Sequence, residues 1–196
     1  MMATKERPIS GTNFLQGKIL IALPGMTDPR FERSVIYMCA HSAEGAMGLV
    51  INKPIEGLHL HQLLEQLEIK PAPSAPNPSV MFGGPVETGQ GFVLHTNDYE
   101  KGESTLTISP DVSLTTTLDV LRAMAQGHGP QNALFALGYA GWGPGQIETE
   151  IQANGWVHCD PDMNLLFGAD MDGKWAVALR KLGIDMSGLS AHAGRA

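Results

Sequence analysis

Two cysteines and two histidines carry the side chains that zinc prefers, and they raise the first question about chemistry. The four are Cys39, His41, His158 and Cys159. Residues two apart on a strand point the same way, so Cys39 and His41 are expected on one face. Zinc sites usually take both thiolates from one short C-x2–4-C segment, and the sequence contains none. We therefore expect a buried thiol beside a hydrogen-bonded histidine, with no metal and no cofactor.

Nucleophilic catalysis has no sequence-local signature either. No serine lies in a G-x-S-x-G motif, and none of the seven histidines has a neighbour in the sequence that would activate Ser or Cys. Catalytic groups can still assemble from distant segments. The alternative of an enzyme, such as a hydrolase, would therefore use His95 or Cys39, with the helix start at 143–146 as an anion site.

The segment 137–150, LGYAGWGPGQIETE, concentrates glycine and aromatic residues. We call it the glycine corner. Its glycines are spaced G-x-x-G-x-G-x-G, which is neither the dinucleotide fingerprint nor a Walker loop, so no nucleotide is implied. The pattern predicts a strand end after 133–137, a glycine turn, and a helix that starts at about Gly143. Gln146 would then reach back to the free backbone donors of that start.

Two interpretations of the glycine corner stay open. In one, Gly138 and Gly141 let the chain turn tightly beneath Trp142, whose indole covers the core. In the other, the helix start and the glycines form a recognition cleft for a carboxylate or phosphate. Glu148 and Glu150 on the following helix are expected to form a solvated face.

Further polar groups and glycines fall at the ends of predicted strands. If the fold brings them beside Tyr139 and Trp142, they would line a pocket containing a cation, an imidazole and backbone donors. The hypothetical ligand or partner surface consists of Asn52, Lys53, Gly83, Gly84, His95, Tyr139, Gly141, Trp142 and Gln146.

Hydrophobic patterning predicts the elements that must position these residues. Apolar runs rich in β-branched residues predict strands at 18–23, 34–40, 48–51, 80–82, 91–95, 105–109 and 133–137. Helical spacing of leucines predicts helices at 58–68 and 115–126, and further helices are expected at 143–154 and 174–182. Four prolines within 70–79 predict an extended surface connector. Segment 1–13 is expected to be flexible, and 14–196 to form one domain.

Composition narrows the class of protein. The formal net charge of −7 repels phosphate backbones and anionic lipid surfaces, which argues against nucleic-acid binding. No apolar run approaches the roughly 20 residues that span a bilayer, and no secretory signal is evident. Two cysteines are too few for a disulfide scaffold. We expect a cytoplasmic protein that does not associate with membranes.

Four blocks of the chain resemble the AlgH/YqgE family of small bacterial proteins. They are SVIYMCAHSAEGAMGLVINKP (34–54), FGGPVETGQGFVLH (82–95), LGYAGWGPGQIETEI (137–151) and LLF (165–167). The resemblance covers about 14–196. It implies an α+β fold in which a bent, split and mostly antiparallel sheet forms a pseudo-barrel with helices packed outside. It implies no known activity, although one member gave the family its label as a proposed regulator of alginate synthesis genes.

Three functions are compatible with the sequence. The first is a non-enzymatic binding or regulatory protein that acts through a partner protein or a small ligand at the strand-end surface. The second is the enzyme described above. Direct regulation of transcription through DNA contact is the weakest, because the charge is negative and the basic residues are scattered.

Overall fold

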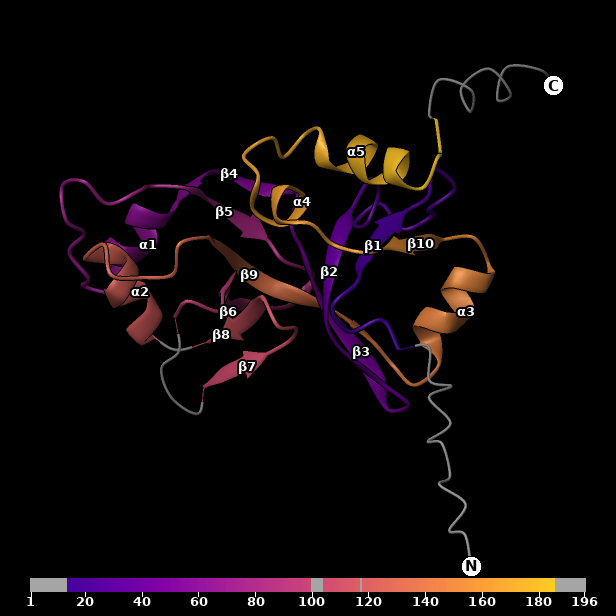
Figure 1. Ribbon diagram of the computed structural model, residues 1–196, viewed down its shortest axis with the longest axis horizontal. Helices are drawn as coiled ribbons and strands as arrows, with labels where there is room; N and C mark the ends of the chain where they lie inside the picture. Colours follow the sequence, from indigo (N-terminus) through magenta and orange to yellow (C-terminus); the bar gives the residue numbers. More distant parts are fainter. Residues whose placement is uncertain (1–13, 100–103, 117, 186–196) are drawn as a thin grey trace, which may run out of the picture.

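Ten strands and five helices make up the parts of the chain that the computed structural model describes, residues 14–99, 104–116 and 118–185 (Figure 1). The segment predicted to be flexible, 1–13, lies outside the described residues. The strands are β1 (Ile19–Ala22), β2 (Val35–Ser42), β3 (Gly45–Val50), β4 (Pro54–His59), β5 (Ser79–Phe82), β6 (Val86–Thr96), β7 (Thr105–Thr107), β8 (Val112–Thr115), β9 (Ala133–Trp142) and β10 (Trp156–Cys159). The helices are α1 (Leu60–Gln66), α2 (Leu118–Ala125), α3 (Gln146–Gln152), α4 (Met163–Phe167) and α5 (Lys174–Lys181).

The strands form a curled, mostly antiparallel sheet, which confirms the predicted α+β class. The strand order is β10-β1-β2-β3-β9-β6-β8-β7. Strand β5 adds to β9 in parallel, and β4 pairs with β5. All other pairings are antiparallel. Together these pairings form a half-barrel, against which a few helices pack.

Strand β9 joins the two halves of this half-barrel, and it runs through the middle of the molecule (Figure 1). Its first part pairs with β5 and β6, whereas its last part pairs with β3, with Gly141 opposite Met47. The sequence had predicted a strand that ends at Leu137, which was wrong. Gly138 adopts a φ of +74°, and this bends the strand without ending it. The turn of the glycine corner is therefore confined to residues 143–145.

Three apolar clusters fill the space on both sides of the curled sheet. The first draws residues from strands of both halves and from α4 and α5, so the sheet wraps around it. The second lies under α3 and contains Trp142, Ile147 and Trp156. The third lies between the β5–β6–β9 part of the sheet and helices α1 and α2. Strand β1 shows the arrangement directly, since Ile19 and Ile21 belong to the first cluster and Leu20 to the second.

Three strands have no counterpart in the predictions from sequence. Strand β4 is largely exposed, so the alternation of apolar and polar residues is weak there. Strands β8 and β10 have four residues each, and their sequences, VSLT and WVHC, mix polar and apolar types. Each pairs along its whole length with a neighbour that carries a clearer apolar pattern, β8 with β6 and β10 with β1. Tertiary pairing has determined these short strands.

Candidate functional site

The structure divides the nine predicted site residues among several places. Tyr139, Gly141 and Trp142 line one shallow depression of about 650 Å³ beside the β2–β3 hairpin. Asn52, Lys53, Gly83, Gly84, His95 and Gln146 do not belong to its described lining. The hypothesis of one pocket uniting an imidazole, a cation and the glycine corner is therefore wrong.

The paired glycines Gly83 and Gly84 serve close backbone packing. A Cβ on Gly83 would lie 2.2 Å from the carbonyl oxygen of Gly138. One on Gly84, whose φ is +155°, would lie 2.0 Å from the carbonyl carbon of Tyr139. The Gly83 amide donates to Leu137 O at 2.8 Å, and its carbonyl accepts from Val50 N at 2.9 Å. The main chain of β9 already occupies the space that a ligand would need.

Asn52 and Lys53 hold the loop between β1 and β2. The Asn52 Oδ1 accepts from Val35 N at 2.9 Å, and its Nδ2 donates to Arg33 O at 2.8 Å. The Lys53 ammonium donates to Arg30 O at 3.1 Å, and burial lowers the pKa of this lysine. Both side chains are therefore engaged with main-chain groups.

His95 is fully buried between β6 and β8. Its Nδ1 lies 2.9 Å from the Thr96 carbonyl oxygen, which can only accept, so this nitrogen carries the proton. Its Nε2 then accepts from the Thr115 hydroxyl at 2.7 Å. A histidine beside a hydroxyl has the composition of a base–nucleophile pair, but both residues have no exposed surface. The pair is therefore closed to solvent in this conformation, although Thr115 borders the cleft described below.

The polar groups of the glycine corner are paired with one another. Glu150 Oε2 accepts from the indole N–H of Trp142 at 2.8 Å and from that of Trp156 at 3.0 Å. Trp142 is 7% exposed. Gln146 reaches back as predicted, since its Oε1 accepts from Gly143 N at 2.9 Å. The expectation that Glu150 belongs to a solvated face was wrong. Two buried indole N–H groups lie beside this carboxylate, and each needs a hydrogen-bond acceptor.

His41 and Glu148 link the start of the described chain to α3. His41 Nδ1 accepts from Leu15 N at 2.9 Å, so Nε2 carries the proton and donates to Glu148 Oε1 at 2.7 Å. The main cause that lowers the pKa of the Glu148 carboxyl group is a hydrogen bond from the backbone of the same residue. The hydrogen bond with His41 lowers this pKa further. The pair is thus a structural contact, and Glu148 is not simply solvated.

The thiol chemistry considered from the sequence is blocked by burial. Cys39 has no exposed surface, and burial raises the pKa of its thiol to about 12. A bulge between Met38 and Ala40 breaks the alternation of β2, so Cys39 packs in the first cluster while His41 contacts Leu15 and Glu148. Cys39 and His41 therefore do not share a face as expected. Among the described residues, no group of three or more His, Cys, Asp or Glu side chains could hold a metal ion.

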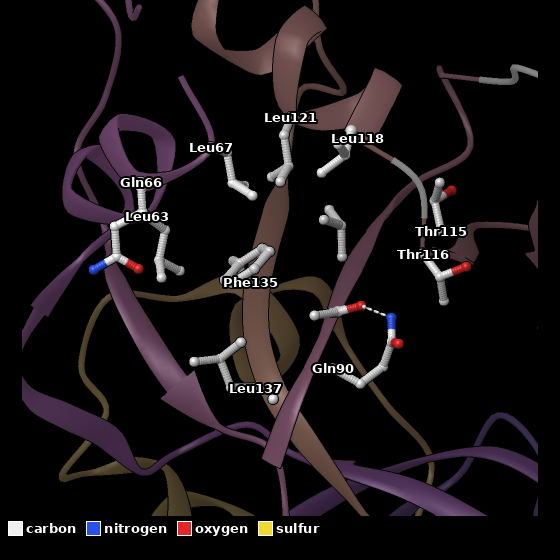
Figure 2. Close-up of a pocket in the computed structure, with 13 residues that line it drawn as sticks. Leu63, Gln66, Leu67, Gln90, Thr115, Thr116, Leu118, Leu121, Phe135 and Leu137 are labelled. Carbon is white, nitrogen blue, oxygen red and sulfur yellow. Dashed lines mark hydrogen bonds between the residues drawn. The ribbon is translucent and has the colours of Figure 1, made fainter. Parts of the chain in front are cut away.

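A second cavity, separate from the depression beside the β2–β3 hairpin, lies between α1, α2 and the sheet. This apolar cleft has a volume of about 410 Å³ and is partly enclosed. Figure 2 shows Phe135 near its centre, leucines of both helices on one side, and Gln90 and two threonines toward its edge. The lining residues are Leu63, Gln66, Leu67, Gly89, Gln90, Gly91, Val93, Thr115, Thr116, Leu118, Leu121, Phe135 and Leu137.

The cleft arises because two short helices carry more leucine than the core beneath them can bury. On α1, Leu60 and Leu64 are buried, whereas Leu63 and the following Leu67 line the cleft. Leu67 and Leu118 are each 41% exposed. The glycine at position 91 adds to the hollow, because a Cβ there would lie 2.9 Å from the Phe135 ring. The leucine stripes were visible in the sequence, where they predicted the helices but not the cleft between them.

The cleft has no side chain suited to acid–base or nucleophilic catalysis by ionisation. Among its described lining residues there is no Asp, Glu, His, Lys, Arg or Cys. Its polar side chains are two glutamines and two threonines, and the hydroxyl of Thr115 is hydrogen-bonded to His95. Such a composition suits the binding of an apolar group.

The curled, mostly antiparallel sheet, the helices packed against it and the cleft define an α+β half-barrel protein. The chain belongs to the AlgH-like family, whose model matches residues 19–187. A UPF0301 protein of Bradyrhizobium diazoefficiens is 54% identical over 99% of this chain and 94% of its own length. One of Azorhizobium caulinodans is 51% identical over the full length of both chains.

Solved structures agree with this assignment. The solution structure of the AlgH protein from Pseudomonas aeruginosa is 41% identical and matches with a TM-score of 0.73, covering 95% of this chain and 98% of that one. A crystal structure of protein DIP2367 from Corynebacterium diphtheriae shares the fold, with a TM-score of 0.67 at 18% identity over 88% of each chain. In the described part of this chain, no helix is both long and apolar enough to cross a membrane.

Proposed function

We propose that this protein is a non-enzymatic binding protein, and that the apolar cleft between α1 and α2 holds a small, mainly apolar ligand. The observation that carries the proposal is the partial exposure of Leu67 and Leu118 around a cavity of about 410 Å³. Ligand sites in proteins are typically 300–1,000 Å³ in volume and mostly apolar, with a few polar groups for orientation. The cleft has this size and composition.

The alternatives are less well supported. An enzyme would need its candidate groups at a surface, but Cys39 and His95 have no exposed area. Direct DNA binding is opposed by the net charge of −7. Any regulatory role of this protein would then act through its ligand. A cytoplasmic location fits the two free, buried cysteines, which form no disulfide with each other.

The test uses the uncharged fluorescent probe N-phenyl-1-naphthylamine, whose emission rises in apolar surroundings. We expect saturable binding to the wild-type protein. The substitution Leu67→Asp should weaken binding by about tenfold or more, because it places a carboxylate among apolar groups. Leu67 is partly exposed, so the variant should remain folded, which circular dichroism verifies.

A matched control is Leu106→Asp on β7. Leu106 is 49% exposed and does not belong to the described lining of the cleft. This variant should bind the probe like the wild type. If the wild type shows no saturable binding, or if both variants bind equally, the cleft is not a ligand site.

A further inference from the structure

The charge of the groups around the cleft restricts what it can hold. An ionised ligand head inside the cavity would lose water without gaining an ion partner, because no described lining residue is charged. The chain adjacent to the lining carries mainly carboxylates. Glu65 and Glu68 flank the lining residues of α1, Glu87 precedes those of β6, and Asp119 follows Leu118. Arg122 on α2 is paired with Asp119 at 3.2 Å.

One edge of the cleft offers neutral hydrogen-bonding groups. The register between β6 and β9 shifts between Val86 and Gly91, so residues 87–90 bulge from the ladder without partners in β9. Gly89 and Gln90 on this bulge line the cleft. The Gln90 Nε2 donates to Gly91 O at 3.1 Å, as Figure 2 shows. Its Oε1 accepts no hydrogen bond from the described residues, so it is free to accept one from a ligand.

Building on the proposed binding function, we infer that the cleft selects neutral amphiphiles, whose apolar body lies against Phe135 and the leucines while an uncharged hydrogen-bonding head meets the 87–90 bulge. Alcohols and primary amides have such heads. A carboxylate head is disfavoured twice, by desolvation without an ion partner and by repulsion from the carboxylates on the flanking chain.

The experiment compares octan-1-ol, octanamide and octanoate as competitors of the fluorescent probe at pH 8, where octanoate is ionised. The three have apolar chains of similar length and differ in the head group. We expect the alcohol and the amide to displace the probe, and octanoate to do so about tenfold less well. Octylammonium serves as a fourth competitor and should also be weaker than octan-1-ol.

A substitution designed to strengthen octanoate binding tests where the head group lies. Gln90 is exposed, and Gln90→Lys would supply an ion partner at the bulge. Octanoate should then compete nearly as well as octan-1-ol. The matched control is Thr107→Lys on β7, which adds the same charge at an exposed position outside the described lining and should leave octanoate weak.

The outcomes separate this inference from the function on which it rests. If the probe binds and is lost in Leu67→Asp, the binding function stands. Octanoate that competes as well as octan-1-ol would then overturn the selectivity alone. Octylammonium stronger than octan-1-ol would likewise overturn it, by showing that the flanking carboxylates dominate. If Gln90→Lys leaves octanoate as weak as Thr107→Lys does, the head group does not lie at the bulge.

Discussion

The glycine corner and the apolar cleft are both places where a helix packs beside β9, yet they differ in what remains free. In the corner, Trp142 and Trp156 are buried and their N–H groups share the Glu150 carboxylate. In the cleft, Leu67 and Leu118 remain 41% exposed around open space. The difference shows that dense glycine and tryptophan mark close packing in this fold, whereas leucines left over from two short helices leave open apolar space.

The largest expected effect tests whether the corner is structural. Trp142→Ala should lower the free energy of unfolding by about 3–5 kcal/mol, because it removes a buried indole from the second apolar cluster. Urea denaturation followed by circular dichroism measures the change. At urea concentrations where it stays folded, the variant should bind the fluorescent probe with wild-type affinity.

The variant Trp142→Phe separates the contributions to this effect. It keeps a buried ring but removes the hydrogen bond to Glu150, and it should cost less than Trp142→Ala, about 1–2 kcal/mol. A negligible loss of stability in Trp142→Ala together with loss of probe binding would reverse the comparison, making the corner the binding site.

An effect of about 3 kcal/mol tests the desolvation argument on which the charge selectivity of the cleft rests. Lys174 at the start of α5 is 3% exposed, and among the described residues its ammonium donates only to the carbonyls of Ile51 and Leu166. Burial lowers the pKa of Lys174 from 10.5 to about 8. Between these values the unfolded chain binds more protons than the folded one, so this group makes stability rise with pH.

The measurement is the difference in unfolding free energy between the wild type and Lys174→Met at several pH values. From pH 8 to 10.5, this difference should shift in favour of the wild type by up to about 3 kcal/mol, at 1.36 kcal/mol per pKa unit. Burial raises the pKa of Cys39, Tyr37 and Tyr99, and the contribution of these groups is the same in both proteins and cancels in the difference. A difference that does not change with pH would show that the ammonium is well solvated, and would weaken the desolvation argument.

The smallest effect contrasts two glycines of the same segment. Gly84→Ala should cost about 1–3 kcal/mol or more, because its Cβ would overlap the main chain of Tyr139. A Cβ on Gly89, which lines the cleft, would meet no neighbouring atom within 4 Å. The free energy of unfolding of Gly89→Ala should therefore stay within about 0.5 kcal/mol of the wild-type value. Thermal or urea denaturation measures both. Equal costs would mean that the two glycines have the same role.

Much of the fold could be predicted from local pattern. The apolar runs at 18–23 and 34–40 became β1 and β2, and the leucine stripe at 58–68 became α1. Each element carries its signal in its own residues, because burial of one or both faces imposes a period on the sequence. The reach of Gln146 to Gly143 was also foreseeable, since the two residues are only three apart.

The candidate site could be predicted only in part. Tyr139, Gly141 and Trp142 do line a common depression, but His95 and Lys53 belong elsewhere. Local pattern cannot tell which partner a polar side chain will find. Thr115, which holds His95, is 20 positions away in the chain. The bulge in β2 also reversed the expected relation of Cys39 and His41.

By itself, the sequence determined which segments are apolar, where most helices and strands lie, and that the molecule carries a net negative charge. Only the tertiary structure decided that β9 continues through Gly138 to pair with β3, and that Glu150 accepts hydrogen bonds from two indoles. It also decided which leucines of α1 and α2 stay uncovered. The physical reason is that periodicity records which side of an element avoids water, whereas the space left between elements depends on how their surfaces meet.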